Sequence, residues 1–474
     1  MVQGCSSNAG KSYLTAGLCR LYAKRGLKVA PFKAQNMSNN AGVTPVGLEM
    51  GRAQLLQAQA AGVVPDVRMN PVLIKPEGDT QSQVVVLGKA DLSVSKLPWT
   101  ERKPHLWERV RSSLHSLMDE YDLVILEGAG SPAEVNLKRS DIVNMRVAKE
   151  VGARVLLAAD IDRGGAFAHL LGTWHCLDEE ERGLLSGFIL NKFRGDAALL
   201  GGAADWLEAK TSVPTLGVVP HLKLPLPEED AFSLEPPTPK ESRTVVAILR
   251  TPAMSNFDEF DALIHEPEVE VRWAEHPDAL DGASALILPG SKHVAADLSW
   301  LERMGLGSAI GSAAEQGVII WGVCGGLQML GRVLRDPHSV ESGGVARGLS
   351  LLDVETELAR DKVTKQVNVN VRSWNVAAAG YEIHHGATRA EKPTRPFLDG
   401  GLGYVRDNVY GVYVHGLFDH APFRQRFLAL VGTESSGLEW SAQVDTALDT
   451  LAAHLETHLD MQAIDRACFG GNVI

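Results

Sequence analysis

The sequence predicts two consecutive α/β domains, each built around a parallel β-sheet. The chain has 474 residues, 45% of them hydrophobic, and short β-rich segments alternate with helical ones in both halves. A single hydrophobic core seldom extends beyond roughly 250–300 residues, so a chain of this length is expected to divide. Alternating strands and helices are typical of parallel sheets with crossover helices.

Strand-like segments bounded by glycine or acidic residues recur through the first half. They lie at residues 27–31, 123–127, 155–160 and 187–191. In the second half the segments TVVAILR, EVRWAE, SALILPGS and GVIIWGVCGG form another alternating series. Both series predict sheets whose functional groups gather at the carboxyl ends of the strands.

A break in this pattern marks the expected domain boundary. Proline and charged residues replace any periodicity in PLPEEDAFSLEPPTPKESR, which begins at Pro225. Segments of this composition connect domains. Leucines at 448, 451, 455 and 459 have helical spacing and predict a packing helix. We expect a first domain at 1–225, a linker at 226–243, a second domain at 244–440 and a helical tail at 441–474.

Charge and composition argue against several classes of function. The formal net charge is -12, whereas nucleic acids and anionic membranes are bound mainly by clustered lysine and arginine. No apolar run approaches the roughly 20 residues that span a bilayer, and the first residues do not have a signal-peptide pattern. The cysteines are scattered, without metal or disulfide spacing. We expect a cytoplasmic protein with small-molecule partners.

The N-terminal segment GCSSNAGKS has the features of a phosphate-binding loop. Gly4 and Gly10 would let the backbone approach an anion where a helix begins and unpaired N–H groups converge. Lys11 would neutralise phosphate charge, and Ser12 would offer its hydroxyl to Mg²⁺. The two glycines stand one residue further apart than in the common motif, and a glycine-rich helix cap is the alternative. Few residues precede the loop, so a start upstream of Met1 stays open.

Two further segments place polar groups at strand ends of the same predicted sheet. Glu127 follows the apolar segment LVIL. Asp160 ends VLLAAD and is followed by Asp162 and Arg163. Carboxylates suit Mg²⁺ and arginine suits phosphate oxygens, whereas the alternative for each acid is a turn residue that caps the next helix. Together with the loop, these residues favour a site for ATP and Mg²⁺.

In the second half, Cys324 lies in the segment GVCGG between a predicted strand and a predicted helix, LQMLGRVL. Small neighbours allow the sharp turn of such an elbow, which would present the thiol to solvent at a helix N-terminus. Cys324 is therefore a candidate nucleophile, and a small buried apolar residue is the alternative. Backbone N–H groups at Gly325 and in the loop at Gly290 would form an oxyanion hole.

A nucleophilic cysteine requires a base, and histidine is the usual one. His415 follows a β-branched and aromatic run in VYGVYVHGLFD, and His384 and His385 in GYEIHHG are the other candidates. Each histidine taken alone is more often structural than catalytic. The residues alone leave the choice among the three open.

Several segments, taken in order, resemble the cobyric acid synthase family of the cobalamin pathway across nearly the whole chain. They are GCSSNAGKS, APFKAQNMSNN, RMNPVLIKP, EGAGSPAEVNL, DIDRGG, ILNKFRGD, LPGSK, GVCGGLQMLG, GYEIHHG and VHGLFD. The first domain resembles the P-loop ATPases that are like dethiobiotin synthetase. The second resembles class I glutamine amidotransferases of the cobyrinic-acid branch.

The resemblance implies an activity that joins the two sites. Glutamine would be hydrolysed at Cys324 with His415 as the base, and ammonia would pass to the first domain. There ATP, with Mg²⁺, would activate carboxylates of adenosylcobyrinic acid a,c-diamide, a corrinoid. The b, d, e and g side-chain carboxylates would become amides.

The resemblance also assigns roles to residues of the first domain. Lys11 and Ser12 belong to the ATP loop, Glu127 is the expected magnesium ligand, and Asn191 of ILNKF would contact the adenine. Six further residues would flank the triphosphate or the acceptor carboxylate: Lys33, Gln35, Asn36, Asp160, Asp162 and Arg163. The oligomeric state, the order of amidations and the ammonia route are not predicted.

The chain departs from related patterns at two positions. Cys5 stands where the family loops usually have threonine, which would spare the backbone cradle and remove a hydroxyl. Leu417 stands where other class I glutaminases have a glutamate two positions after the base. The resemblance therefore implies a Cys–His dyad whose histidine is oriented by a group from elsewhere in the chain.

Two other functions are weighed against this one. A sister enzyme of the same branch, the a,c-diamide synthase or a cell-wall amidotransferase, would use identical chemistry on other carboxylates, but KAQNMSNN and DIDRGG favour cobyric acid synthase. A partitioning-type switch ATPase with a degenerate thiol domain is the alternative from another class. Such ATPases carry a signature lysine where this chain has Ser6.

Overall fold

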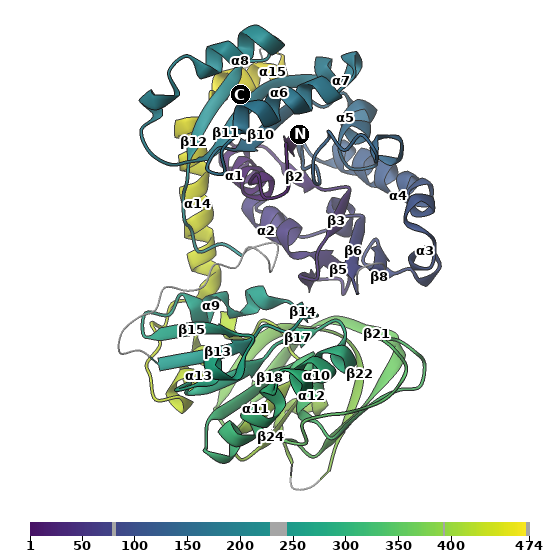
Figure 1. Ribbon diagram of the computed structural model, residues 1–474, viewed down its shortest axis with the longest axis vertical. Helices are drawn as coiled ribbons and strands as arrows, with labels where there is room; N and C mark the ends of the chain where they lie inside the picture. Colours follow the sequence, from purple (N-terminus) through teal and green to yellow (C-terminus); the bar gives the residue numbers. More distant parts are fainter. Residues whose placement is uncertain (78–81, 228–243, 392–393, 471–474) are drawn as a thin grey trace.

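The computed structural model describes residues 1–77, 82–227, 244–391 and 394–470. It has two α/β lobes, one formed by the first half of the chain and the other by most of the second half (Figure 1). Of the predicted linker, residues 228–243 lie outside the described residues.

A parallel sheet forms the centre of the first lobe. Its strand order is β1-β10-β11-β12, and the parallel pair β2-β9 lies beside β1 because Val2 bridges Glu127 directly after β9. The strands are β1 (Val2–Gly4), β2 (Val29–Phe32), β9 (Leu123–Leu126), β10 (Val155–Asp160), β11 (Leu185–Phe193) and β12 (Thr215–Pro220). The strands expected in this half are present, with boundaries shifted by a few residues.

Helices connect these strands, and the apolar face of the first one is buried. Leu14, Leu18 and Leu21 recur at helical spacing and lie in the core of the lobe. The helices are α1 (Lys11–Lys24), α2 (Arg52–Ala61), α3 (Leu92–Ser95), α4 (Trp99–Glu120), α5 (Met145–Val151), α6 (Ala166–Cys176), α7 (Glu179–Leu184) and α8 (Ala203–Thr211).

Two small sheets lie on the side of the first lobe that faces the second (Figure 1). They comprise β3 (Gln35–Met37), β6 (Val72–Pro76), β7 (Ser82–Val86) and β8 (Lys89–Ala90), and the hairpin of β4 (Ala41–Val43) and β5 (Glu49–Gly51). Their apolar side chains form a buried cluster with Tyr381 and Ile383 of the second lobe. The two lobes therefore share a small hydrophobic core at their contact.

The second lobe is built on a seven-stranded sheet of order β15-β13-β16-β18-β25-β24-β23. The pairs from β15 to β25 are parallel and the last two are antiparallel. The strands are β13 (Thr244–Leu249), β15 (Val269–Ala274), β16 (Ala285–Leu288), β18 (Ile319–Val323), β23 (Arg395–Leu398), β24 (Gly403–Arg406) and β25 (Val409–Val412). The helices are α9 (Asp261–Ile264), α10 (Val294–Arg303), α11 (Leu306–Glu315), α12 (Gly325–Leu330) and α13 (Ala421–Leu430).

A long antiparallel hairpin, absent from the sequence prediction, belongs to a separate four-stranded sheet and lies along the lobe contact (Figure 1). Its strands are β21 (Val354–Val371) and β22 (Val376–Ala390), joined to β19 (Val333–Asp336) and β20 (Gly344–Arg347). A separate short pair is formed by β14 (Met254–Ser255) and β17 (Gly290–Ser291). Many exposed polar residues interrupt the alternation of buried and exposed side chains along β21, so the length of this strand was not evident from hydropathy.

The tail returns to the first lobe as α14 (Trp440–His458) and α15 (Met461–Phe469), drawn yellow in Figure 1. Leu448, Leu451 and Leu455 of α14 are buried in the same core as α1. A Cβ atom at Gly17 of α1 would lie 2.4 Å from Leu455 Cδ1, so the close approach of the two helices requires glycine. The predicted packing helix thus packs on the first domain.

Candidate active site

The phosphate-loop segment connects β1 to α1, as a nucleotide-binding loop does. Gly10 has a φ of 90°, and a Cβ atom there would lie 2.1 Å from Asn191 Nδ2. Only glycine fits this position, because its φ is positive and the space is filled. Asn191 Nδ2 donates a hydrogen bond to Ala9 O at 2.8 Å. Asn191, the expected adenine contact, therefore supports the loop in this structure.

The ammonium group of Lys11 lies over the loop. It donates hydrogen bonds to Ser6 O at 3.0 Å and to Gly130 O at 3.2 Å. The Lys11 side chain is buried. Its charge thus lies between the loop and the segment after β9, where it faces the backbone that would surround a phosphate.

Glu127, at the carboxyl end of β9, is the centre of the polar contacts beside the loop. Its carboxylate is buried and accepts hydrogen bonds from Ser12 Oγ at 2.8 Å and from Gln57 Nε2 at 2.5 Å. Lys33 Nζ forms an ion pair with it at 2.9 Å. The structure thus brings Ser12, Lys33 and Glu127 together, and adds Gln57 of α2, which the sequence did not indicate.

This set of groups suits magnesium. A serine hydroxyl, a carboxylate and the amide oxygen of Gln57, which is buried and has no hydrogen-bond partner, are all hard oxygen ligands. Within the described ranges no three His, Cys, Asp or Glu side chains are grouped as a metal cage. Mg²⁺ commonly uses one or two protein ligands and completes its shell with water and substrate phosphates.

The remaining residues predicted for this site lie around it with different partners. Asp160 ends β10, is buried, and pairs with Lys192 at 3.3 Å and with Arg163 at 3.5 Å. Asp162 pairs with Arg194 at 3.2 Å. Because the Arg163 side chain is 64% exposed, it can reach a ligand without disturbing the core.

Gln35 and Asn36 lie on β3, away from the loop contacts. Asn36 Nδ2 donates to Gln54 Oε1 of α2 at 2.9 Å. The Gln35 side-chain oxygen is buried and has no hydrogen-bond partner among the described residues. Asn36 is therefore held by α2. Among the described residues, its side chain forms no hydrogen bond with Lys11 or Glu127.

Cys324 lies at the elbow between β18 and α12, in a backbone conformation that non-glycine residues rarely adopt. Its φ is 52° and its ψ is -102°. A Cβ atom at Gly326 would lie 2.0 Å from Leu288 O, so the turn depends on a residue without a side chain there. The helix that follows ends at Leu330 and is shorter than predicted, because the next residues enter β19.

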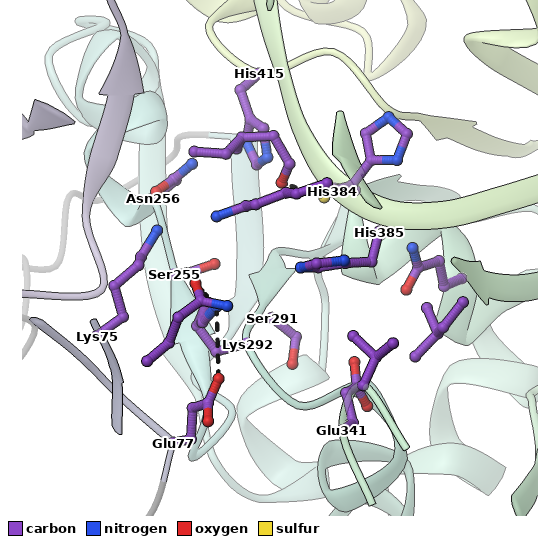
Figure 2. Close-up of a pocket in the computed structure, with 17 residues that line it drawn as sticks. Lys75, Glu77, Ser255, Asn256, Ser291, Lys292, Glu341, His384, His385 and His415 are labelled. Atoms are coloured by element: carbon purple, nitrogen blue, oxygen red, sulfur yellow. Dashed lines mark hydrogen bonds and ion pairs between the residues drawn. The ribbon is translucent and has the colours of Figure 1, made fainter. Parts of the chain in front are cut away.

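The expectation that the thiol faces open solvent is wrong: Cys324 is only 6% exposed. It lines a pocket between the two lobes, and residues of the first lobe form part of the wall of this pocket. Figure 2 shows Lys75 and Glu77 approaching from the first lobe, with His385 and Glu341 across from them. Other residues that line the pocket are Gln83, Ser255, Asn256, Ser291, Lys292, Gln328, Lys362, His384 and His415.

His415 is held on one side by Cys324 and on the other by a carboxylate from a distant segment. His415 Nδ1 lies 2.9 Å from Glu259 Oε1, and Gly416 N donates to Glu259 Oε2 at 3.3 Å. Burial alone would lower the pKa of His415, but Glu259, together with the charge and hydrogen bond of Cys324, raises this pKa to about 10. Tyr381 stacks on the imidazole ring. The arrangement therefore favours an imidazolium beside the thiol at neutral pH.

Glu259 is the group that the sequence did not reveal. It belongs to the acidic segment SNFDEFDAL, whose charges suggest an exposed surface, yet Asp258, Glu259 and Asp261 are all buried. It stands 156 residues before His415 in the chain. No local spacing links the two residues, so only the folded structure shows the pair.

The other two histidine candidates have different partners. His384 contacts Gly386 O through Nδ1 at 2.9 Å and Glu382 Oε2 through Nε2 at 3.0 Å, and it stacks on Tyr413. His385 Nδ1 contacts Ala359 O at 3.1 Å. Burial and the nearby charges of two lysines lower the pKa of His385 to about 4. Both nitrogens of His384 are engaged away from Cys324, which favours His415 as the base.

The two glycines predicted for the oxyanion hole lie beside the thiol and the imidazole. A Cβ atom at Gly325 would lie 2.7 Å from Ser291 N, and one at Gly290 would lie 3.1 Å from His415 Cε1. The backbone of β17 and the start of α12 thus approach each other closely next to Cys324. N–H groups so placed suit the stabilisation of a developing oxyanion.

Comparison with known proteins identifies both domains. Residues 1–227 match the CobQ/CobB/MinD/ParA nucleotide binding domain, and residues 245–423 match the CobB/CobQ-like glutamine amidotransferase domain. The cobyric acid synthase of Deinococcus radiodurans is 56% identical over 477 residues, covering 98% of this chain and 99% of that protein. The chain belongs to the cobyric acid synthase family. The cobyric acid synthase of Variovorax paradoxus is 47% identical, with 97% of each chain covered.

Membership of the cobyric acid synthase family confirms the predicted fold class, a nucleotide-binding α/β domain followed by a glutamine amidotransferase domain. It also confirms that the protein is a glutamine-dependent, amide-forming ligase. The two cobyric acid synthases match this chain through both domains, including the amidotransferase domain. This argues against a partitioning-type ATPase with a degenerate second domain. None of the described helices is long and apolar enough to cross a membrane.

We predict that His415→Ala lowers glutaminase turnover far more than His384→Ala does. General bases typically contribute about 10² to 10⁴ in rate, whereas the partners of His384 give it a structural role. Glutamate release from glutamine by the two purified variants measures the difference. If both variants keep native-like stability and lose the same share of glutaminase turnover, His415 is not the base.

Proposed function

We propose that the protein amidates the b, d, e and g carboxylates of adenosylcobyrinic acid a,c-diamide, using ATP and glutamine, to give adenosylcobyric acid. One observation supports this proposal most. The chain is 56% identical to a cobyric acid synthase and contains both a buried Cys–His–Glu array and a phosphate loop with a buried carboxylate beside it. We place this reaction in the cytoplasm, where both co-substrates are available.

The glutaminase half follows from the arrangement around Cys324. The thiolate attacks the carboxamide carbon of glutamine, and the oxyanion is stabilised by N–H groups near Gly290 and Gly325. His415 gives its proton to the leaving nitrogen, so that ammonia departs and a thioester remains. Water, deprotonated by His415, then hydrolyses the thioester to glutamate. Glu259 keeps the ring aligned in both steps and stabilises its charged form.

The synthetase half takes place at the loop of the first domain. The substrate carboxylate attacks the γ-phosphoryl group of ATP, ADP leaves, and ammonia then displaces phosphate from the acyl phosphate to form the amide. Lys11 would neutralise charge on the transferring group. Glu127 and Ser12 would hold Mg²⁺, which supplies further neutralisation of the phosphate oxygens. Lys33, Arg163 and Asp160 would orient the acceptor or the phosphates, and the ion pairs of Lys33 with Glu127 and of Arg163 with Asp160 support this role.

The assignment is tested by mass spectrometry of adenosylcobyrinic acid a,c-diamide incubated with the protein, MgATP and glutamine. We predict four successive amidations, each changing the mass by the difference between OH and NH₂. Omission of either ATP or glutamine serves as the control. A corrinoid whose mass stays unchanged would overturn the proposal.

We predict that Cys324→Ser abolishes glutamine-dependent synthesis and leaves ammonia-dependent synthesis. A serine hydroxyl is a far weaker nucleophile than a thiolate, whereas free ammonia reaches the acyl phosphate without a thioester. ADP release and amide formation are followed with glutamine and, separately, with an ammonium salt at mildly alkaline pH. Undisturbed use of glutamine would mean that another residue is the nucleophile.

We predict that Lys11→Ala lowers synthesis by about 10² or more with either nitrogen source, because an uncompensated phosphoryl charge raises the barrier. Hydrolysis of glutamine should survive, since Cys324 lies in the other domain. The two activities are measured on the same preparation. Near-native ammonia-dependent synthesis by this variant would contradict the phosphate-loop assignment.

A further inference from the structure

Helix α2 of the first lobe reaches into the second lobe through its first residue. Arg52 Nε forms an ion pair with Asp258 Oδ2 at 2.6 Å. The Asp258 side chain is 2% exposed and that of Arg52 is 23% exposed, so most of this pair is removed from solvent. Exposed ion pairs contribute little, but a largely desolvated pair strongly constrains the geometry of both groups.

The acid that Arg52 binds directly precedes the acid that orients His415. Asp258 and Glu259 lie in one short turn of 3₁₀ helix, Phe257–Phe260. At the start of this turn Asn256 has a φ of 55°, and its side-chain Oδ1 accepts a hydrogen bond from Ala41 N at 3.1 Å. The first lobe therefore holds the turn at two points, from β4 and from α2.

The turn lies among several buried acidic side chains, and Arg52 is a cation close to them. Asp258, Asp261 and Asp419 all act on Arg52, and Tyr381 faces it as well. Burial, together with the charges of Asp258 and Glu259, raises the pKa of Asp419 to about 7, while Arg52 and Arg424 oppose the shift. Without Arg52, repulsion among these carboxylates would displace Glu259 from its position beside His415.

We propose that Arg52 is a positioning residue for glutamine hydrolysis, supplied to the amidotransferase domain by the ATP-binding domain. By binding Asp258 it fixes the 256–259 turn so that Glu259 meets His415 Nδ1. The glutaminase array is then complete only when the two domains are docked. This inference rests on the proposed glutaminase role of Cys324 and His415.

A docking contact without catalytic consequence is the competing explanation, and the chain contains a matched control for it. Gln366 Nε2 of β21 donates to Val43 O of the first lobe at 2.7 Å. This hydrogen bond also joins the lobes, yet it does not involve the 256–259 turn. Gln366→Met therefore removes an interdomain contact without removing a hydrogen bond or ion pair of the 256–259 turn.

The experiment compares Arg52→Met, Arg52→Lys, Gln366→Met and Glu259→Gln in the full chain, with steady-state glutaminase and ammonia-dependent synthesis measured on each. For Arg52→Met we expect the glutaminase kcat to fall about 10- to 100-fold, with KM for glutamine changed less than about threefold. Ammonia-dependent synthesis should stay within about twofold of the native rate. Arg52→Lys should recover part of kcat because it restores the charge, and Glu259→Gln should reproduce the kcat loss of Arg52→Met.

Each other outcome overturns the inference. A native kcat in Arg52→Met would show that the ion pair does not position the base. A loss confined to KM, or one equalled by Gln366→Met, would assign Arg52 to docking alone. Equal losses with glutamine and with ammonia would make it a residue of the general fold. If the native protein itself hydrolysed no glutamine, the proposed function would fail instead.

Discussion

Each of the two sites is organised around a buried glutamate, and the cost of burying that charge determines what surrounds it. A carboxylate removed from water is tolerated only when it is paired and hydrogen-bonded. Glu259 meets this condition through His415 and the Gly416 amide, and Glu127 meets it through Lys33, Ser12 and Gln57. In both cases the partners that compensate the charge are also the groups that the chemistry requires.

The same constraint links the domains through α2. Arg52 at its first position binds the turn that carries Glu259, and Gln57 binds Glu127. The helix rises about 1.5 Å per residue, so these two contacts are separated by only about 7.5 Å, or roughly one and a half turns. Any movement of α2 along its axis would change both contacts, and α1 and the tail helix α14 also pack against it.

Features encoded by neighbouring residues were predictable from the sequence, and features made by distant ones were not. The phosphate loop and the Cys324 elbow depend on small residues within a few positions, so their motifs are visible in the chain. The roles of Glu259 and Gln57 depend on contacts across 156 and 70 residues, with no spacing to reveal them. Solvent exposure of Cys324 was predicted wrongly because the groups around it are distant in the chain: Ile383 of β22 contacts the thiol, and Lys75 of the other domain lines the same pocket.

The side chains that line this pocket also determine its electrostatic environment. Burial and the charges of Lys362 and Lys75 lower the pKa of Lys292 to about 7, and burial lowers that of Lys75 to about 8 although Glu49 opposes it. Under the proposed function, ammonia released in this pocket would experience the same two forces, desolvation and repulsion by neighbouring cations, and both disfavour its protonation. Only NH₃, with its free electron pair, can attack an acyl phosphate. A pocket closed by lysines of both domains, Lys292 and Lys362 on one side and Lys75 on the other, therefore suits the transfer of unprotonated ammonia.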